Sequence, residues 1–557
     1  MVDGGSSGSA PRRGPRLRIV SINDVYALEN LPRLATLVAA AAAGTVAAAS
    51  PGEGAPDRVL VVLAGDFLAP SILSSLDGGR GMVECLNAVG VTHVTFGNHE
   101  DDVPLIALQE RVGELHAKWL ATNVHGFTPA LPASDVVEVT APGGRTVKVG
   151  LVGVVMNDAA VYREVPFGGA HVEPPNDAVR RAGRELVEGA GCACVVAVTH
   201  QPLDDDRRLA AEAEALRVPV IVGGHEHAVH IEQVGRAWIV KAGMDAVAGA
   251  ITDLAWPAEA PAAGAPDVPE ARVRLEPVAG YAENAALRTL VDLHMLRVHA
   301  LEGAALVALG EGESLSSVGV RIQQTTLGTL VCTRLRDALG AEACVFNAGG
   351  IRAARTYTGR FAYGDLKAEV PFDNEIVVVR LPGAVLRDAI EASRAHAPAE
   401  SGGYLQVDDR TIVQEPAHAL TSIGGVPLDP ERDYRVALVR NLLEGMDHIG
   451  PLVDFARAHP ERVPPVGSGR DVKIVLVDSF ARVLWRQLGG FDAVDANHDG
   501  RVTRTEIADA VARLTHAAPS SVAAELVLTA IDTKHQGEIT KDEVEEVEGP
   551  GGRRGDP

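Results

Sequence analysis

Cysteine and long hydrophobic runs are scarce in this chain of 557 residues, which has only 5 cysteines. The cysteines form no C-x-x-C pair, so we expect reduced, buried thiols in a cytoplasmic protein rather than a disulfide framework. The most apolar stretch, residues 34–49, is mostly alanine and too short to cross a bilayer, so no membrane association is predicted. The N-terminal residues include arginines but no apolar segment behind them, which indicates a disordered tail rather than a secretory signal.

Basic residues are also few relative to acidic ones. The chain has 51 Lys+Arg against 74 Asp+Glu, a formal net charge of −23, which argues against a nucleic-acid polymer as the main partner because such a partner requires a basic surface. The proportions of hydrophobic (46%) and charged (22%) residues are those of folded globular proteins. At roughly 150 residues per domain, the length predicts about three to four domains.

Strand and helix patterns divide the chain into successive regions. In the first, short Val- and Ile-rich runs such as LRIVSI, RVLVVLAGD and CVVAVTH alternate with helical patterns, which is typical of strands buried on both faces of a layered α/β domain. A second α/β region has helices near 327–339 and 383–395 and strands such as EIVVVRL, and the last region is short, acidic and helical. The predicted boundaries are 1–16 (tail), 17–282 (first domain), 283–301 (linker helix), 302–478 (second domain), 479–548 (helical region) and 549–557 (tail).

Asp, Asn and His residues follow five of the predicted strands in the first domain. Each lies just past the C-terminal end of its strand, at the edge where the loops of an open α/β sheet converge on one crevice. A single such histidine is more often an ordinary loop residue, but five strands that all end in oxygen or imidazole donors are hard to reconcile with chance. The residues are Asp24, Asp66, Asn98, His99, His200, His225 and His227.

This mixture of side chains suits a pair of divalent cations. A bridging carboxylate with further donors divided between two ions, about 3.5–4 Å apart, acidifies a bound water and stabilises an in-line displacement at phosphorus. Mixed nitrogen and oxygen ligands suit Mn²⁺, Zn²⁺ or Fe better than Mg²⁺ alone. We therefore predict a two-metal site that acts on a small phosphorylated substrate.

Five ordered motifs carry a family resemblance. IND-x-Y, AGDF, FGNHEDD, VTHQP and GGHEH resemble the calcineurin-like metallophosphoesterases and, within them, the 5'-nucleotidase family. NAGGIR (347–352) and VPF (370–372) look like the substrate-binding C-terminal domain of that family, so the resemblance covers about residues 17–478. It implies a four-layer α/β/β/α metallophosphoesterase sandwich, followed by a second α/β substrate-binding domain, in an enzyme that hydrolyses phosphate monoesters.

The resemblance also implies roles for the residues at the motif positions. Asp24, Asp66 and His227 would hold one metal, Asp66 would bridge to the second, and a metal-bridging hydroxide would be the nucleophile. His99 would not be a ligand but would act as a cationic or proton-donating group at the phosphoryl oxygens or the leaving group, with Asp102 orienting its imidazole. The ligands of the second metal would be Asp66, Asn98, His200 and His225.

The first motif departs from the family pattern. The family usually has Asp-x-His, whereas this chain has Asp24-Val25-Tyr26. Free tyrosine has a pKa of about 10, so its phenol is a poor ligand at neutral pH unless the metal displaces the proton, as trivalent iron does. Tyr26 is thus either a weak or iron-selecting ligand or a packing residue beside a site with fewer protein ligands, and we favour the second interpretation.

The second domain is expected to select the substrate. The glycines of NAGGIR let a ligand approach the backbone closely, and its arginine can fork onto a phosphate or carboxylate. By resemblance, Asn347, Arg352 and Phe372 are substrate-binding positions, with Phe372 one aromatic of a base-stacking pair. The loop 441–450 lacks the second aromatic, and we place His448 in its position. A nucleoside monophosphate is the first prediction, and a sugar phosphate or another organic monoester is the alternative.

The C-terminal region contains a calcium-loop pattern. DANHDGRVTRTE (495–506) fits the twelve-residue EF-hand loop, with Gly500 at the bend and helical patterns on both sides, so we predict an all-α EF-hand pair that binds Ca²⁺. A second loop, 532–543, has Lys534 at a ligand position, and we expect it to pair structurally without strong binding because an ammonium group repels the cation. The predicted calcium ligands are Asp495, Asn497, Asp499, Arg501, Thr503 and Glu506.

The sequence therefore predicts a cytoplasmic two-metal phosphoesterase with an attached EF-hand pair. That calcium modulates the enzyme is a hypothesis that follows from covalent attachment alone, and a plain tether, a stabilising cap or a protein partner of the pair is equally allowed. The rival interpretation is a catalytically silent calcium sensor on a phosphatase scaffold. Retention of His99, Asp102 and the metal ligands argues against the rival, because a binding platform needs none of them.

Overall fold

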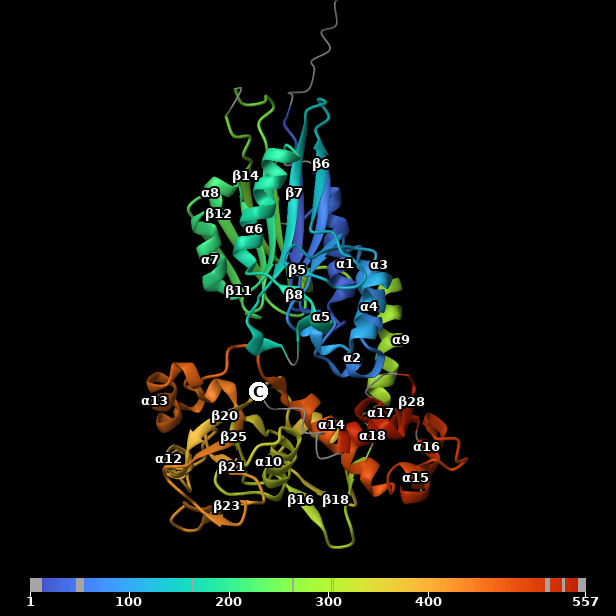
Figure 1. The fold of residues 1–557 in the computed structure, drawn as a ribbon, viewed down its shortest axis with the longest axis vertical. Helices are drawn as coiled ribbons and strands as arrows, with labels where there is room; N and C mark the ends of the chain where they lie inside the picture. Colours follow the sequence, from blue (N-terminus) through green and yellow to red (C-terminus); the bar gives the residue numbers. More distant parts are fainter. Residues whose placement is uncertain are drawn as a thin grey trace, which may run out of the picture. The chain divides into compact units, whose positions relative to one another are not determined.

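The computed structural model describes residues 13–46, 55–162, 165–262, 265–301, 303, 305–515, 521–532 and 536–548 (Figure 1). The chain divides into two compact units, Met1–His294 and Met295–Pro557. Most of the two predicted tails, and Lys534 of the second calcium loop, lie outside the described residues. Among the described helices, none combines the length and the hydropathy that a membrane crossing requires.

A six-stranded sheet with the order β14–β13–β1–β2–β3–β4 forms one half of the first unit. The four strands β1 to β4 run parallel, and β13 and β14 complete an antiparallel edge. The strands are β1 (Arg16–Ile22), β2 (Arg58–Ala64), β3 (His93–Thr95), β4 (Lys118–Leu120), β13 (Ala248–Ala255) and β14 (Glu270–Pro277). β1 begins at Arg16, and Arg13 forms an ion pair with Asp57 at 2.6 Å, so the last residues assigned to the N-terminal tail from the sequence belong to the folded first unit.

A second six-stranded sheet has the order β11–β12–β10–β9–β7–β6, in which β7, β9, β10 and β12 run parallel. Its strands are β6 (Ser134–Thr140), β7 (Thr146–Val155), β9 (Cys194–His200), β10 (Val220–Gly224), β11 (Val229–Val234) and β12 (Ala237–Ala242). The two sheets share one core, which includes Ile19 and Val62 from the first sheet and Val196 and Val222 from the second. The continuous apolar runs become strands buried on both faces, because helices cover the outer face of each sheet.

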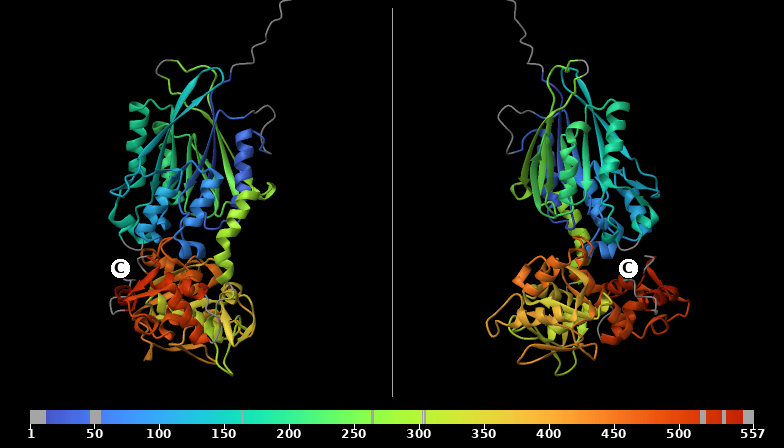
Figure 2. Two further views of the ribbon diagram at one scale, coloured as in Figure 1. Left: turned by 90° about the vertical axis from the view of Figure 1, so that its right-hand side faces the viewer. Right: turned by 60° about the vertical axis from the view of Figure 1, so that its left-hand side comes forward.

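Helices pack on both outer faces (Figure 1 and Figure 2). The first sheet is covered by α1 (Leu31–Ala43) with α3 (Arg80–Val89), and the second by α6 (Pro175–Arg184), α7 (Leu203–Ala211) and α8 (Ala213–Leu216). This order of helix, sheet, sheet and helix is the four-layer arrangement that the resemblance implies. The unit also contains α2 (Ile72–Asp77), α4 (Leu105–Glu114), α5 (Pro166–Gly169) and the short strands β5 (Val124–His125) and β8 (His171–Val172).

The second unit is built on a five-stranded sheet with the order β21–β17–β25–β20–β26. Its strands are β17 (Ala343–Asn347), β20 (Glu375–Pro382), β21 (Leu405–Val407), β25 (Asp433–Val439) and β26 (Arg470–Asp471). The helices are α10 (Thr326–Ala338), α11 (Tyr363–Glu369), α12 (Gly383–Arg394), α13 (Gly450–Ala458) and α14 (Val472–Gln487), while α9 (Ala285–Leu301) contains the division between the units. Short strands complete the unit: β15 (Ala305–Ala308), β16 (Ser314–Ser316), β18 (Thr356–Thr358), β19 (Arg360–Ala362), β22 (Thr411–Gln414), β23 (Ala419–Ile423) and β24 (Val426–Pro427).

The C-terminal part of the second unit is helical, with one short strand pair. Its elements are α15 (Phe491–Val494), β27 (Arg501–Thr503), α16 (Arg504–Thr515), α17 (Ser521–Ile531), β28 (Glu538–Thr540) and α18 (Lys541–Glu548). β27 and β28 pair antiparallel, with Val502 opposite Ile539 and both fully buried. The helix expected before the first calcium loop is broken between α14 and α15, because Gly489 and Gly490 take positive φ values of 95° and 73°, which a helix does not accommodate.

Candidate metal centre and substrate site

The predicted metal ligands of the first unit lie at the C-terminal ends of parallel strands from both sheets. Asp24 follows β1, Asp66 follows β2, His200 ends β9 and His225 follows β10. Backbone hydrogen bonds join the first two of these loops, since Asp24 donates its N–H to the oxygen of Gly65 at 3.1 Å. Parallel pairing thus delivers groups from distant parts of the chain to one sheet edge.

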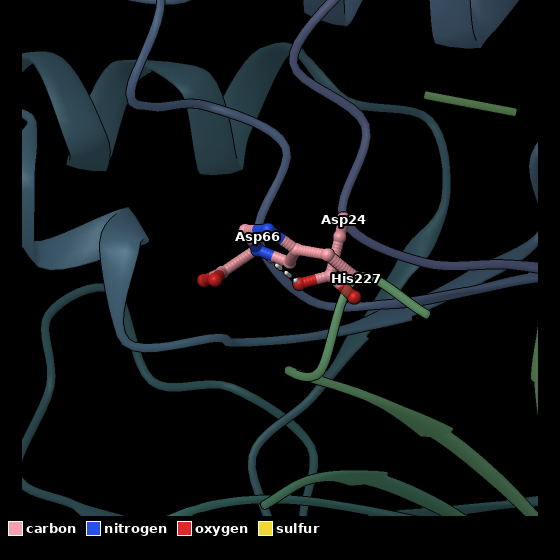
Figure 3. A group of neighbouring side chains, drawn as sticks. All are labelled: Asp24, Asp66 and His227. Atoms are coloured by element: carbon pink, nitrogen blue, oxygen red, sulfur yellow. Dashed lines mark ion pairs between the residues drawn. The ribbon is translucent and has the colours of Figure 1, made fainter. Parts of the chain in front are cut away.

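Three of the predicted ligands form one cluster (Figure 3). Donor atoms of Asp24, Asp66 and His227 all lie within 4.8 Å of one another. The Nε2 atom of His227 lies 3.4 Å from Asp24 Oδ1. Asp24 and Asp66 are 0% and 1% exposed, so two carboxylates are buried side by side. Such a set of oxygen and nitrogen donors fits a divalent transition-metal cation.

The imidazole of His200 approaches the same Asp66 carboxylate. Its Nδ1 donates a hydrogen bond to the oxygen of Ala64 at 2.8 Å, and its Nε2 lies 3.1 Å from Asp66 Oδ2. This Nε2 atom is buried and makes no hydrogen bond with the described residues. The ring of His225 stands edge-on to that of His200, with centroids 5.6 Å apart. Metal-binding histidines are typically oriented by a hydrogen bond from one ring nitrogen, as Nδ1 is here, which leaves the other nitrogen for the metal.

Four of the predicted ligands hold a backbone conformation that is rare outside glycine. The φ angles are 53° at Asp24, 56° at Asp66, 96° at His225 and 58° at His227. Each such residue costs on the order of 1–3 kcal/mol, and such strain is typical of functional sites. The carboxylate of Asp24 accepts the backbone N–H of His225 at 3.0 Å, which ties the two strand-end loops together.

Glycines in the motifs permit this close approach. A Cβ atom on Gly97 would lie 2.0 Å from Asp66 Oδ1, and one on Gly224 would lie 2.3 Å from the oxygen of Ala64. No side chain fits at either distance, so the glycines of FGNHEDD and GGHEH are required for the strand ends to meet.

Burial and neighbouring charges shift the pKa values of the clustered groups in different directions. Burial disfavours a charged ring at His200, but the carboxylates of Asp66 and Asp24 raise the pKa of His200 to about 10. Burial likewise opposes ionisation of Asp66, yet His200 and His99 hold the pKa of its carboxyl below the usual range. Burial and the neighbouring His200 lower the pKa of His225 to about 3. Positive charge is therefore favoured at His200 and disfavoured at His225, while Asp66 stays ionised between them.

The phenol of Tyr26 points into this cluster. Its oxygen lies 2.9 Å from His227 Nε2, 3.1 Å from Asp66 Oδ2 and 3.4 Å from Asp24 Oδ1. The hydroxyl thus faces the predicted ligands rather than the hydrophobic core, which favours the ligand interpretation over the packing interpretation preferred from the sequence. Whether Tyr26 binds a metal is untested.

The predicted His–Asp pair lies beside the cluster, in a turn of 3-10 helix, His99–Asp102. His99 Nδ1 lies 2.8 Å from Asp102 Oδ2, and both side chains are mostly buried. The backbone N–H of His99 also donates to Asp66 Oδ1 at 2.9 Å. Asn98, which is buried, precedes the turn. The carboxylate of Asp102 therefore fixes the orientation of the His99 ring, as its predicted role requires.

Glu100 is a residue of this site that the motif comparison missed. Its carboxylate is 0% exposed and accepts the backbone N–H groups of Asp66 at 2.9 Å, Phe67 at 2.7 Å and Leu68 at 3.1 Å. Burial and the charge of Asp66 raise the pKa of Glu100 to about 7. Glu100 thus holds the loop that carries Asp66. Its place inside FGNHEDD is the only sequence signal, and that signal does not reveal its partners.

In the second unit, Asn347 ends β17 and is buried. Its amide Nδ2 donates to Asp447 Oδ2 at 2.7 Å, a pairing between residues 100 positions apart that the sequence did not indicate. A Cβ atom on Gly349 would lie 3.3 Å from the Asn347 amide and 3.5 Å from the Asp447 carboxylate, so the glycine turn of NAGGIR approaches both groups.

Arg352 and Phe372 come together next to this turn. The Arg352 guanidinium carbon lies 5.3 Å from the centre of the Phe372 ring, which is 45% exposed, and Arg352 donates to the oxygen of Gly349 at 3.4 Å. His448 is exposed and follows Asp447, and both have positive φ values of 55° and 58°. The structure thus brings the predicted residues of NAGGIR and VPF to one region. His448 lies next to Asp447, which contacts Asn347 of that region.

In the loop 495–506, for which the sequence predicts calcium binding, hydrogen bonds join the first and last residues to the turn between them. Asp495 Oδ2 accepts the N–H of Gly500 at 3.1 Å, while Asp495 Oδ1 is buried and makes no hydrogen bond with the described residues. Glu506 Oε2 accepts the backbone N–H and the hydroxyl of Thr503 at 2.9 and 2.8 Å. The remaining predicted ligands, Asn497, Asp499 and Arg501, are linked along the same turn by hydrogen bonds of 2.8 and 2.9 Å.

Two family models match the two units. Residues 17–229 match the calcineurin-like phosphoesterase family, and residues 304–453 match the 5'-nucleotidase C-terminal domain. The first unit thus contains a calcineurin-like phosphoesterase domain, and its homologues form a family of hydrolytic enzymes. In this chain the metallophosphoesterase domain is followed by a 5'-nucleotidase C-terminal domain.

Several relatives match the chain at low identity. Protein UshA of Escherichia coli is 23% identical over 439 residues, which are 70% of this chain and 78% of that protein. The 5'-nucleotidase of Vibrio vulnificus is 23% identical over 428 residues, 68% of this chain and 75% of that protein. Protein UshA of Yersinia enterocolitica is 30% identical over 128 residues, so the chain spans only 23% of that relative.

Solved structures show the same fold. The NAD nucleotidase of Haemophilus influenzae has a TM-score of 0.60 at 14% identity and covers 85% of this chain and 97% of its own. A putative 5'-nucleotidase from Staphylococcus aureus has a TM-score of 0.55 at 14% identity and covers 83% of this chain and 96% of its own.

We predict that Glu100→Gln destabilises the protein by roughly 2–6 kcal/mol, because the amide NH₂ would face backbone N–H groups and leave about two buried donors unsatisfied. Urea unfolding followed by circular dichroism measures the change. The matched control is Glu110→Gln, since Glu110 also lies in the first unit but its side chain is 55% exposed, and its partner Arg111 keeps a second ion pair with Glu114. Equal midpoints for Glu100→Gln and the parent would contradict the assigned role.

Proposed function

We propose that the first unit binds two divalent cations and hydrolyses phosphate monoesters. The observation that carries the proposal is the convergence of Asp24, Asp66 and His227, whose donor atoms lie within 4.8 Å of one another. These three residues would hold one cation, and Asp66 would bridge to the other. When bound, the cations supply Lewis-acid activation of water and of the phosphoryl group. The second cation would be held by Asp66, Asn98, His200 and His225.

The residues around the cations have distinct tasks. Asp102, 2.8 Å from His99 Nδ1, orients the imidazole that we place at the phosphoryl oxygens or the leaving group as a cation or proton donor. The phenol oxygen of Tyr26, within 3.4 Å of three ligand atoms, would add a fourth donor to the first cation. Burial and the charges of Asp66 and Asp24 raise the pKa of the Tyr26 phenol, so beside divalent cations it would be a weak, protonated donor, whereas a trivalent iron at that position would displace its proton.

A nucleoside monophosphate is the proposed substrate. Two similar proteins carry names that refer to nucleotides, the 5'-nucleotidase of Vibrio vulnificus and the NAD nucleotidase of Haemophilus influenzae. In this chain, the half-exposed ring of Phe372 beside Arg352 offers a stacking surface, and the Asn347–Asp447 pair offers polar groups next to it. A sugar phosphate is the alternative, because the loop with His448 lacks a second aromatic ring.

We also propose that the loop 495–506 binds Ca²⁺ as one half of an EF-hand pair. The proposal is supported by the positive φ of Gly500 (82°), by the buried Val502–Ile539 pairing of β27 with β28, and by the buried, unbonded Asp495 Oδ1 described above. Such loops take calcium through oxygens at fixed positions around that bend. Regulation of the enzyme by calcium remains a hypothesis.

Asp66→Asn is expected to lower Mn²⁺-dependent phosphate release from an aryl phosphate by about 10³-fold or more, because metal activation contributes several kcal/mol and each 1.4 kcal/mol is a factor of about ten. Colorimetric phosphate assays at saturating Mn²⁺ measure the rate. Asp135→Asn is the control, since this carboxylate of the same unit pairs with His93 and Lys118 instead of the cluster. Equal rates for the parent and Asp66→Asn would favour the silent calcium sensor.

Phe372→Ala is expected to raise the KM for a nucleoside monophosphate about tenfold, because stacking a base on an aromatic ring contributes about 1–3 kcal/mol. The KM for ribose 5-phosphate, which has no base, should stay unchanged. Steady-state kinetics on both substrates measure the difference, with Val466→Ala, another exposed apolar residue of the second unit, as control. An equal change for both substrates would argue against base stacking.

Glu506→Gln is expected to weaken Ca²⁺ binding more than tenfold, roughly the loss that follows when the bidentate closing ligand is removed. Calorimetric titration of the full chain with Mn²⁺ at saturation measures the affinity. Glu543→Gln, the corresponding position of the second loop, should leave the affinity unchanged. Loss of Ca²⁺ binding in both variants would show that the second loop also holds calcium. A parent protein that binds no Ca²⁺ would remove the proposal.

A further inference from the structure

A lysine is completely buried near the proposed metal centre. Lys241 lies on β12 in the apolar run AWIVKA, and it is 0% exposed. Removing an ammonium group from water costs several kcal/mol unless hydrogen bonds and opposite charge surround it. The partners of Lys241 therefore show which groups compensate for the burial of its charge.

All three N–H groups of the ammonium are used, and two of the acceptors are backbone oxygens. Lys241 Nζ donates to the oxygen of Gln201 and to the oxygen of Gly224, both at 2.8 Å. The third acceptor is the carboxylate of Glu226, and Asp206 Oδ2 lies 2.9 Å away as a second counter-ion. An ammonium group has three donors, so its hydrogen-bonding capacity is complete.

These acceptors flank the three predicted imidazole ligands. Gln201 directly follows His200, Gly224 directly precedes His225, and Glu226 separates His225 from His227. One ammonium group therefore joins the loop after β9 to the loop after β10. The two loops belong to neighbouring parallel strands, but the strand pairing ends at Gly224 and His200, so beyond that point other contacts must set their spacing.

Both carboxylates extend the same connection. Asp206, at the start of α7, accepts the hydroxyl of Thr199 at 2.8 Å and the amide of Gln201 at 2.9 Å. Glu226 accepts the backbone N–H of Leu203. The network thus holds residues on both sides of His200 through the same charges that hold the GGHEH loop.

A motif glycine makes room for the lysine. A Cβ atom on Gly223 would lie 2.8 Å from Lys241 Cε and 2.9 Å from Asp206 Oδ2. Any side chain at Gly223 would displace the Lys241 side chain or its counter-ion Asp206. The first glycine of GGHEH is therefore required for the lysine network, whereas the second is required for the close approach of the strand ends.

We propose that Lys241 is a positioning residue of the metal centre, which fixes the spacing between His200 and the pair His225 and His227 by binding the backbone of both loops. The proposal rests on the proposed function, since it presupposes that these imidazoles bind a cation. Lys241 itself does not touch the substrate or the cations.

The sign of one measurement separates positioning from a simple effect of charge. Removal of a positive charge beside a cation site strengthens cation binding if the charge acts only through its field. Loss of a positioning group weakens cation binding, typically by about 10–100-fold. Lys241→Met, which keeps the length of the side chain but removes its donors and charge, is therefore expected to weaken Mn²⁺ binding in calorimetric titration of the full chain.

A matched control distinguishes this effect from general destabilisation. Arg18→Met removes another buried cation of the same unit, which pairs with Asp253 at 2.6 Å and contacts none of the ligand loops. We expect Arg18→Met to lower the melting temperature without changing Mn²⁺ affinity. Affinity that falls equally in both variants would overturn the proposal, because weaker binding would then follow from loss of stability.

A second variant covers the case in which Lys241→Met fails to fold. Combining it with Asp206→Asn and Glu226→Gln removes the unpaired buried charges, and the melting temperature should recover. Mn²⁺ affinity still weakened about 10–100-fold in this triple variant would support positioning. Affinity equal to or above that of the parent would overturn it, while a parent protein that binds no Mn²⁺ would remove the metal centre itself and this proposal with it.

Discussion

Two carboxylates buried side by side at one sheet edge impose the constraint on which the first unit depends. Asp24 and Asp66 would repel each other strongly in a low-dielectric interior unless donors and positive charge met them. Backbone N–H groups of His225 and His99 and the imidazole of His200 do so here. The left-handed φ angles at the strand ends follow from this constraint, because they let the loops turn sharply enough to bring these groups together.

The same rule operates one layer further out. Glu100 is buried with its carboxylate covered by backbone N–H groups, and Lys241 is buried with its ammonium covered by backbone oxygens and carboxylates. Each charged group is satisfied mainly by the loops that carry candidate ligands. The hydrogen bonds that compensate for burying these charges also fix the loops that carry the candidate ligands. Outer contacts of this kind hold metal ligands in place.

The candidate site of the second unit is not built from buried charges. It presents a half-exposed aromatic ring, Phe372, and an arginine whose guanidinium faces that ring, so the surface can accept a flat ligand without a deep cavity. The Asn347–Asp447 hydrogen bond places polar groups next to it. At the C-terminal end, the buried Val502–Ile539 contact joins two loops of which only one has a full set of oxygen donors. The candidate substrate site is therefore more exposed to solvent than the candidate metal centre.

The sequence by itself determined the strands, the strand-end donors and the turn at 495–506 for which calcium binding is proposed, because each is a local pattern of periodicity or of residue types at fixed spacing. The runs at 17–22, 194–200 and 375–381 are strands as predicted, and the His99–Asp102 pair forms within a single turn. Only the tertiary structure decided the direction of the Tyr26 phenol and the partners of Glu100, Lys241 and Asp447. These contacts join residues such as Lys241 and Gln201, 40 positions apart, and Asn347 and Asp447, 100 positions apart, and no local spacing encodes them since they arise only when separate strands pack side by side.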